Sequence, residues 1–365
     1  MERVIAVLAG DGIGTEVTEV AVDVLRAAAE VCSLELTFET GLIGGAAIDE
    51  TGEPLPAATL ELCGRADATL LGAVGGPKWT GVKGAPRPEQ GLLDLRRHLG
   101  VYANLRPIIT FDALLDRCPL RPEIARGVDM LIVRELTGGV YFGKRERSET
   151  DAADECRYSV EEIERVARVA FRAAEGRTGR VASLDKANVL ETSRLWRETV
   201  QRVHDEEFPA VTLEHHLIDS AAMRVIGEPR RFDVILTENM FGDIISDEAS
   251  VLAGSLGLLG SASVAAAPSG AADHRGVGGL YEPIHGSAPD IAGLGLANPI
   301  GAILSAAMLL DIGLGESGAG RAVERAARDA MAMGVRSADL GGEATTSQIG
   351  ATVTEKLCRY ASLRM

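Results

Sequence analysis

The chain has 365 residues, a formal net charge of −16 and a sequence pI near 4.9. An acidic chain of this kind is not a general nucleic-acid binder, which needs a basic face. No apolar run approaches the roughly 20 residues of a membrane span, and the five scattered cysteines form no CxxC pair, so we expect a soluble cytoplasmic protein without disulfides or a zinc site.

Alternating strand and helix signals along the chain predict an α/β fold. An apolar strand at 4–8 runs into a glycine-rich turn, after which hydrophobic residues recur at helical spacing from about 15 to 31. The other strands are expected at 34–39, 68–74, 101–108, 130–135, 181–185, 213–217 and 232–237. The other helices are expected at 57–63, 159–175, 188–208, 219–226, 243–253, 299–310, 319–333 and 347–361, with a loop over 40–55.

This order of elements predicts two domains that share a large mixed, mostly parallel sheet. Residues 1–101 and 254–365 are expected to form one α/β domain, and residues 102–253 a second domain inserted into it. Ser159 followed by Glu162 is a capping box, which places a helix start in the inserted domain.

The glycines at positions 10, 12 and 14 follow the first strand but do not match the dinucleotide-binding fingerprint. That fingerprint requires G-x-G-x-x-G, whereas here every second residue is glycine. We interpret Gly10, Gly12 and Gly14 as a tight strand-to-helix turn. A nicotinamide site must therefore be sought elsewhere in the chain.

Asp243 and Asp247 lie four residues apart in a segment that follows a buried strand. On a helix they would share one face, one turn apart, where like charges repel unless a cation lies between them. Hard cations such as Mg²⁺ and Mn²⁺ prefer carboxylate oxygens. Acidic residues near a helix start also favour the helix dipole, so the pair alone leaves both interpretations open.

Several arginines recur at strand or loop edges. Arg96 and Arg97 follow the leucine-rich segment 91–95, Arg106 precedes a proline, and Arg134 follows three apolar residues. Guanidinium groups bind carboxylates through two parallel hydrogen bonds, so Arg96, Arg106 and Arg134 together suit a di- or tricarboxylate. Taken singly, each is more often a surface or salt-bridge arginine, and Arg97 fits that description.

Lys186 and Tyr141 are candidates for proton transfer. Lys186 is one of only five lysines and stands at the end of a buried strand, where desolvation lowers the pKa of an amine and makes it a general base. A structural ion pair with Asp185 or Glu191 is an equally good reading. Tyr141 lies among glycines and is either a proton donor or an aromatic plug.

Residues 282–293 form a polar loop with the sequence Glu-Pro-Ile-His-Gly-Ser-Ala-Pro-Asp-Ile-Ala-Gly. Its amides, a histidine and a carboxylate are enough to hold an adenosine diphosphate. A carboxylate beside the ribose 2′-hydroxyl favours NAD, because it would repel the 2′-phosphate of NADP. His285 by itself is more often structural.

Taken together, these motifs resemble the β-decarboxylating dehydrogenases, the family of the isocitrate, isopropylmalate, homoisocitrate and tartrate/malate enzymes. The resemblance covers essentially the whole chain. Its segments occur in the family's order, at 10–14, 72–79, 89–96, 104–107, 134–143, 185–191, 239–250 and 285–293. The family fold is α/β but not a Rossmann fold, which agrees with the mismatched glycines.

The resemblance implies how substrate and metal would be bound. Arg96, Arg106 and Arg134 would hold the carboxylates of a malate-type substrate. The ligands of Mg²⁺ or Mn²⁺, which also face the substrate, would be Asp219, Asp243 and Asp247. In this family the lysine and the first aspartate come from the partner subunit, so a homodimer is expected. The resemblance implies that residues 1–101 and 254–365 are the cofactor-side domain and residues 102–253 the substrate and dimerisation domain.

The resemblance also implies the chemistry, an NAD-dependent oxidative decarboxylation. Lys186 would take the hydroxyl proton, through a water, as hydride passes to NAD⁺, and Tyr141 would protonate the enolate left by loss of CO₂. The residues expected to hold NAD are Glu282, His285, Gly286, Ser287, Ala288, Asp290 and Asn298.

The choice of substrate is expected to rest on Glu89, Leu92 and Leu93. An isocitrate enzyme needs hydrogen-bonding side chains here, whereas leucines bury an isopropyl group at about 0.8 kcal/mol per methylene-sized unit. An unpaired carboxylate against them would cost more than that. The prediction is therefore an isopropylmalate enzyme of leucine biosynthesis. A homoisocitrate or tartrate/D-malate enzyme, or a non-catalytic relative that binds carboxylate or metal, is the alternative.

The segment 265–280, just before the cofactor loop, is longer than expected for the family.

Overall fold

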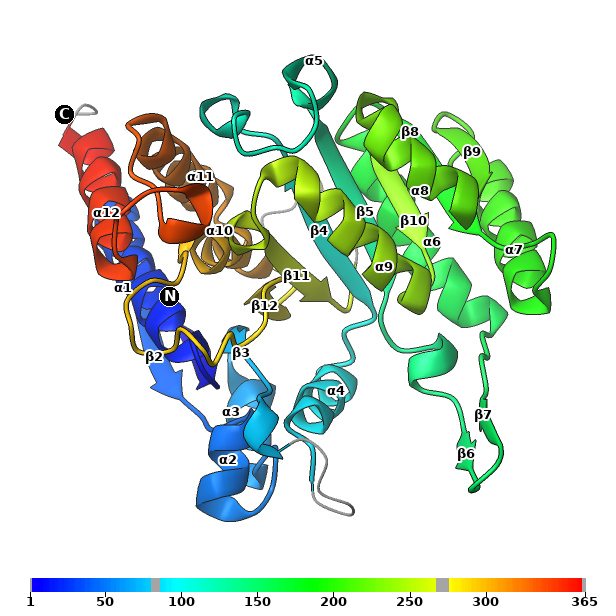
Figure 1. Ribbon diagram of the computed structural model, residues 1–365, viewed down its shortest axis with the longest axis horizontal. Helices are drawn as coiled ribbons and strands as arrows, with labels where there is room; N and C mark the ends of the chain where they lie inside the picture. The colour runs from blue at the N-terminus through cyan, green and yellow to red at the C-terminus, as the bar shows by residue number, and fades with distance from the viewer. Residues whose placement is uncertain (1, 80–85, 267–275, 363–365) are drawn as a thin grey trace. The chain divides into compact units, whose positions relative to one another are not determined.

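The computed structural model describes residues 2–79, 86–266 and 276–362. These residues separate into two compact units of strands and helices (Figure 1). Unit 1 comprises residues 2–79, 86–100, 254–265 and 276–362, and unit 2 comprises residues 101–253 and 266. Residues 267–275 of the long segment before the cofactor loop lie outside the described part of the chain.

Five strands of unit 1 form a mixed sheet in the order β2-β1-β3-β12-β11. The first four are parallel to one another, and β11 is antiparallel to β12. Their bounds are Arg3–Gly10 for β1, Leu36–Thr40 for β2, Ala68–Ala73 for β3, Gly260–Val264 for β11 and Leu280–Pro283 for β12. The sequence pattern did not predict β11 and β12, because both are short and lie among glycine-rich segments.

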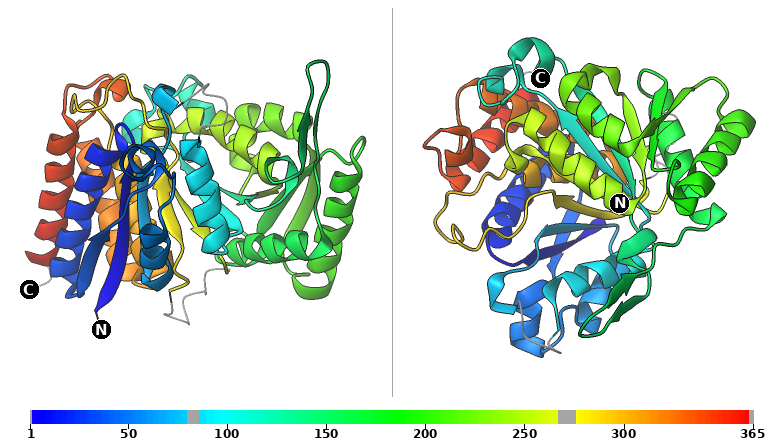
Figure 2. Two further views of the ribbon diagram at one scale, coloured as in Figure 1. Left: turned by 90° about the horizontal axis from the view of Figure 1, so that it is seen from below. Right: turned by 45° about the vertical axis from the view of Figure 1, so that its right-hand side comes forward.

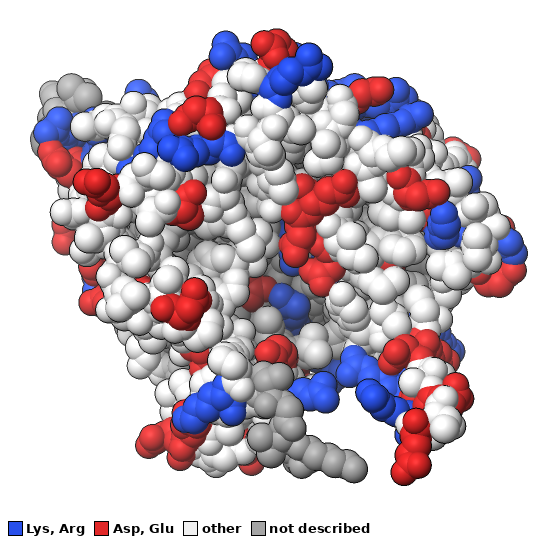
Figure 3. All heavy atoms as spheres, viewed as in Figure 1, with Lys and Arg blue, Asp and Glu red and all other residues white. Residues whose placement is uncertain are grey.

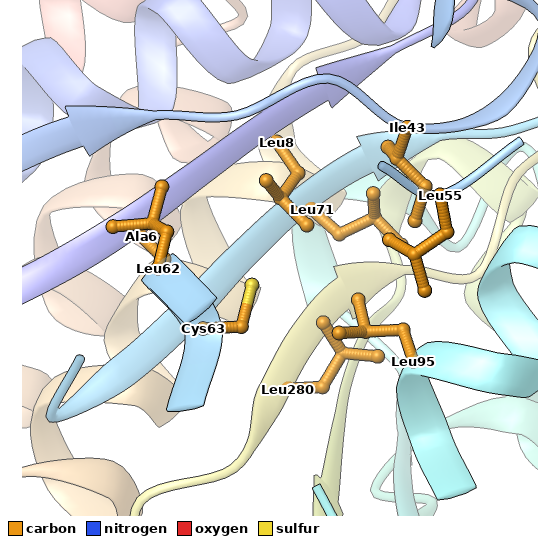
Figure 4. Close-up of a cluster of buried hydrophobic side chains, with 9 residues drawn as sticks. All are labelled: Ala6, Leu8, Ile43, Leu55, Leu62, Cys63, Leu71, Leu95 and Leu280. Atoms are coloured by element: carbon orange, nitrogen blue, oxygen red, sulfur yellow. The ribbon is translucent and has the colours of Figure 1, made fainter. Parts of the chain in front are cut away.

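The helices of unit 1 are α1 (Gly14–Cys32), α2 (Gly44–Thr51), α3 (Ala57–Arg65), α4 (Pro88–His98), α10 (Ile300–Met308), α11 (Ser317–Ala332) and α12 (Thr346–Ser362). Helices α1, α10, α11 and α12 pack against one another (Figure 1). Buried side chains of β1, β3 and β12 meet residues of α3 and α4 in an aliphatic cluster that includes Leu8, Leu71, Leu95 and Leu280 (Figure 4).

The loop expected over 40–55 was wrong, because it contains helix α2. The segment Gly-Gly-Ala-Ala-Ile-Asp-Glu-Thr lacks a clear helical pattern. Ile43, immediately before it, is fully buried in the aliphatic cluster, and Asp11 accepts hydrogen bonds from the backbone N–H groups of Gly45 and Ala46 at 2.8 and 2.7 Å. Tertiary contacts at its first turn therefore set this helix, rather than its own sequence.

In unit 2 the sheet strands lie in the order β4-β5-β10-β8-β9. Only β4 is antiparallel to its neighbour. The bounds are Ala103–Ile109 for β4, Asp129–Glu135 for β5, Arg180–Asp185 for β8, Thr212–Leu217 for β9 and Val234–Thr237 for β10, and a separate hairpin pairs β6 (Arg145–Arg147) with β7 (Ala152–Asp154). The carboxyl ends of β5, β8 and β10 therefore meet at one edge of this sheet.

The helices of unit 2 are α5 (Pro122–Ala125), α6 (Val160–Glu175), α7 (Glu191–Glu207), α8 (Ile218–Gly227) and α9 (Asn239–Ser250). Helices α6 and α7 pack side by side, whereas α8 and α9 lie in front of the strands in the view of Figure 1 (Figures 1 and 2). The predicted capping box is confirmed: the Ser159 hydroxyl accepts from Glu162 N–H at 3.3 Å, and the Glu162 carboxylate accepts from Ser159 N–H at 2.7 Å.

The prediction of an α/β fold with mixed, mostly parallel strands is confirmed in both units. In the part of the chain that the structure describes, no helix combines the length and apolarity needed to cross a membrane. Acidic side chains are spread over the face seen in Figure 3 and alternate with lysines and arginines, in keeping with the negative net charge.

Candidate active site

Helix α9 begins four residues earlier than the sequence pattern indicates. Glu238 is its N-cap, and the Glu238 carboxylate accepts from the backbone N–H of Phe241 at 2.6 Å. The early start places Asp243 and Asp247 in the middle and last turn rather than at the first. An interaction of these acids with the positive end of the helix dipole is therefore weak, because that effect fades within the first turn.

Two of the predicted arginines approach the aspartates of α9. Arg134, at the end of β5, forms an ion pair through Nη1 with Asp243 Oδ1. Arg106, on the neighbouring β4, lies 3.7 Å from Asp243 Oδ1 through Nη2 and 3.7 Å from Asp247 Oδ1 through Nη1. Both arginines are buried, whereas the Asp243 and Asp247 side chains are 36% and 65% exposed. The carboxylates can thus meet a ligand from solvent while the guanidinium groups line the floor.

Tyr141 joins the same cluster. It lies in a short 3₁₀ turn, Gly139–Tyr141, and its hydroxyl donates to Asp243 Oδ2 at 3.0 Å. Burial and the negative charge of Asp243 raise the pKa of the Tyr141 hydroxyl. Burial also raises the pKa of Asp247, against the opposing effect of Arg106. A protonated tyrosine beside a carboxylate pair is an available proton donor.

Lys186 and Asp219 form a pair of their own. Lys186 Nζ lies 3.0 Å from Asp219 Oδ1, and this hydrogen bond lowers the pKa of Asp219. Asp185 instead pairs with Arg197, whose Nε donates to Asp185 Oδ2 at 2.8 Å. Among the residues described, no three His, Cys, Asp or Glu side chains gather closely enough to hold a metal ion. One chain therefore brings two of the three predicted metal ligands together and leaves Asp219 with Lys186.

The donor set of unit 2 fits a hard divalent cation. Two carboxylates one helical turn apart offer only oxygen ligands, the type that Mg²⁺ and Mn²⁺ prefer. The two arginines beside them fit an anionic ligand that would share the same cation. The metal site itself stays a prediction.

In unit 1, Arg96 is held by Glu282. The two form a buried ion pair in which each side chain is 10% exposed. Glu282 was predicted to hold cofactor and Arg96 to hold substrate, and both are buried together in this unit. Glu89 and Leu93 lie nearby on the same helix, α4, and Leu92 packs against the aliphatic cluster.

The predicted cofactor loop is tied to the glycine turn. The carbonyl of Ser287 accepts from Ile13 N–H at 2.8 Å, and a Cβ on Gly12 would stand 2.0 Å from that oxygen. Gly12 has φ +57°, in the left-handed region that favours glycine. The turn beside the cofactor loop therefore tolerates no side chain at position 12.

Some of the remaining loop residues form hydrogen bonds within the chain. Nδ1 of His285 donates to the carbonyl of Gly286 at 2.9 Å, and burial lowers the pKa of His285. Its Nε2 is buried with no hydrogen-bond partner among the residues that the structure describes. Asn298 is buried and donates to Asp339 at 3.0 Å, whereas Ala288 is half-buried and Gly286 and Asp290 are exposed. In a neutral imidazole with Nδ1 protonated, Nε2 is a hydrogen-bond acceptor. This buried acceptor therefore fits a ligand that carries a donor group, such as the amino group of adenine.

Three buried polar residues of the site were not predicted from the sequence. Asn104 and Asn239 hold Arg106 and Arg134, and Asp11 joins the glycine turn to α2 and to Gly75 N–H at 2.8 Å. Asn104 had a usable signal, since residues two apart on a strand face the same side. The contacts of Asn239 and Asp11 span many residues of sequence and leave no local pattern.

Comparisons with known proteins show which family and fold this chain resembles. The family model described as isocitrate/isopropylmalate dehydrogenase matches residues 4–353. A 3-isopropylmalate dehydrogenase from Geobacillus kaustophilus is 57% identical over 342 residues, which is 92% of this chain and 89% of the relative. One from Bacillus caldotenax is 58% identical over 316 residues, 85% of this chain and 83% of the relative. The crystal structure of isocitrate dehydrogenase from Methylococcus capsulatus has a TM-score of 0.84 and 32% identity, and the match covers 98% of this chain and 99% of that one.

Proposed function

Because the chain belongs to the isocitrate/isopropylmalate dehydrogenase family, we propose that it is a 3-isopropylmalate dehydrogenase of leucine biosynthesis. The reaction is the NAD-dependent, metal-assisted conversion of (2R,3S)-3-isopropylmalate to 4-methyl-2-oxopentanoate and CO₂. The observation that carries the proposal is the cluster of Arg106, Arg134, Tyr141, Asp243 and Asp247 at one end of the unit 2 sheet.

In this mechanism the arginines position the substrate. Arg106 and Arg134 bind its carboxylates from the buried floor of the site, with Arg96 of unit 1 as the third predicted carboxylate ligand. When bound to Asp243 and Asp247, a divalent cation supplies Lewis-acid polarisation of the hydroxyl and carbonyl oxygens.

The proton transfers fall to two side chains. The amine of Lys186 takes the hydroxyl proton of the substrate, through a water. NAD⁺, when bound, would supply the hydride acceptor. After the C–CO₂ bond breaks, Tyr141 donates its hydroxyl proton to the carbon that carried the carboxylate. Its raised pKa keeps that proton in place until it is needed.

A homodimer completes the site in this proposal. Large apolar side chains are exposed on the elements that carry the polar residues: Val189 after Lys186, Met223 on α8 and Ile244 on α9 are 61%, 72% and 60% exposed. Exposed apolar groups of this size on adjoining elements are typical of a protein interface. A second copy seated there brings Lys186 and Asp219 of the partner subunit to Asp243 and Asp247.

Unit 1 supplies the cofactor and part of the specificity. The loop at 282–293, with Asn298, would hold NAD, and the exposed carboxylate of Asp290 would exclude the 2′-phosphate of NADP. Leu92 and Leu93 would cover the isopropyl group, while Glu89 stands beside them on α4. Unit 2 is then the substrate and dimerisation domain.

The test is NADH formation, followed by absorbance, with 3-isopropylmalate in the presence and absence of Mn²⁺. We expect turnover that requires the metal and that is weak with NADP⁺. A preference for homoisocitrate or D-malate would refute 3-isopropylmalate as the substrate but leave the family assignment unchanged. The absence of turnover on all three substrates would instead support a non-catalytic relative.

A further inference from the structure

Both substrate-facing arginines of unit 2 are held by a buried asparagine. Arg106 donates through Nε to Asn104 Oδ1 at 2.6 Å, and Arg134 donates through Nε and Nη2 to Asn239 Oδ1 at 3.1 and 2.9 Å. Asn104 and Asn239 are 0% and 1% exposed. In each case a neutral amide oxygen takes the inner edge of the guanidinium group.

The amide of Asn239 can be oriented in only one way. Its Oδ1 accepts from Arg134, and its Nδ2 donates to the carbonyl of Gly138 at 3.1 Å. Its backbone N–H donates to the hydroxyl of Tyr158 at 3.0 Å. These contacts fix Asn239 between β5, the turn before Tyr141 and the start of α9, so the direction of Arg134 is set by three elements at once.

Arg106 and Arg134 meet the Asp243 carboxylate at their outer edge and an amide at the inner one, whereas two other arginines of the same unit are oriented by carboxylates. Arg177 is paired with Asp129 and Asp233, and Arg197 with Asp185, at distances of 2.7 to 2.8 Å. A carboxylate orients a guanidinium group equally well but neutralises its charge. An amide orients the group and leaves its charge available to a substrate carboxylate, an interaction that is strong where water is excluded.

We propose that Asn104 and Asn239 are positioning residues that aim Arg106 and Arg134 at the substrate carboxylates without compensating their positive charge. The inference rests on the proposed function, because it assigns the substrate carboxylates to these arginines. The acids that face the outer edges of both guanidinium groups are Asp243 and Asp247, which the proposed function assigns to the metal ion.

The test compares Asn239→Asp with Asn239→Ala. Aspartate has nearly the shape of asparagine and keeps the acceptor toward Arg134 but loses the donor to Gly138, whereas alanine loses the shape, the acceptor and the donor. If Asn239 served packing alone, Asn239→Asp would bind 3-isopropylmalate better than Asn239→Ala. We expect the reverse order, with the Kd raised a few-fold in Asn239→Ala and roughly ten- to hundredfold in Asn239→Asp, the range of a charge-assisted hydrogen bond.

Binding is measured by calorimetry with the Mn²⁺-loaded full-length protein, and KM and kcat are measured beside it. A selective rise in KM, with kcat within about threefold of wild type, supports positioning of substrate. Gln201→Glu, which adds one negative charge on α7 away from the arginines, is the control and should leave the Kd unchanged. The Asn104→Asp and Asn104→Ala pair repeats the comparison at Arg106 if Asn239→Asp does not fold.

Two outcomes are distinguishable. If wild-type protein neither binds nor oxidises 3-isopropylmalate, the proposed function itself is refuted. If wild type is active but the Asp variants bind the substrate as well as the Ala variants or better, the positioning role of the asparagines is refuted and the function stands.

Discussion

Replacement of Lys186 by methionine separates catalysis from stability more sharply than any other change in the site. Lys186 meets Asp219 at 3.0 Å, yet the two side chains are 27% and 63% exposed. Exposed ion pairs contribute little to stability, because water and salt screen them. Methionine keeps the aliphatic part of the side chain, so we expect Tm to change by no more than about 3 °C.

The catalytic effect should be far larger. If the Lys186 amine takes the hydroxyl proton, its removal eliminates general-base catalysis, which contributes roughly a hundred- to ten-thousandfold. That loss corresponds to about 3 to 5 kcal/mol of activation free energy. The Kd for Mn²⁺ should hardly change, since Asp243 and Asp247 are untouched.

The assay is steady-state NADH formation at saturating 3-isopropylmalate and Mn²⁺, with Tm from circular dichroism. Lys78→Met is the matched control: Lys78 pairs with Asp49 at 2.5 Å in unit 1, with side chains 66% and 43% exposed. It should change neither kcat nor Tm appreciably. A Lys186→Met enzyme with kcat within threefold of wild type would refute the role of Lys186 as base.

Three further changes test other parts of the site. Asp243→Asn should weaken Mn²⁺ binding at least tenfold in a direct titration while α9 persists, and an unchanged Kd would remove Asp243 from the metal site. Leu92→Ser should lower kcat/KM for 3-isopropylmalate relative to D-malate by about tenfold or more, the range for lost apolar contacts; an unchanged ratio in a two-substrate assay would exclude Leu92 from the specificity pocket. Burial lowers the pKa of His215 to about 4, so the unfolded chain binds the proton first and stability is lost as pH falls from about 6.5 to 4. The urea midpoint of His215→Gln should therefore fall less over that range than that of wild type, and parallel curves would contradict the assignment.

Local patterns in the sequence predicted those elements whose signals lie within a few residues of one another. The capping box placed the start of α6 correctly, and the apolar runs located the buried strands β1, β3, β5 and β8. The start of α9 was placed four residues late, because its cap is a glutamate. Glutamate is not among the preferred cap residues, and its side chain caps here through a single hydrogen bond to Phe241 N–H.

Contacts between distant residues could not be predicted in this way. Asn239 meets Arg134 across 105 residues, and Asp11 meets Gly75 across 64. Neither residue has a local partner that reveals its role, and the polarity of an asparagine is equally consistent with a helix start at the surface. The spacing of Asp243 and Asp247 was informative because both ends of that relationship lie on one helix.

The charges of the unit 2 cluster explain why its ligands should bind together. Arg106 and Arg134 carry two positive charges, and Asp243 and Asp247 carry two negative ones, close enough to balance. Burial raises the pKa of Asp247, and the positive charge of Arg106 opposes that rise. A dianionic substrate alone would be repelled by both carboxylates, and a divalent cation alone would be repelled by both guanidinium groups. Bound as a pair they add no net charge, so each lowers the cost of binding the other, and by linkage the effect is reciprocal.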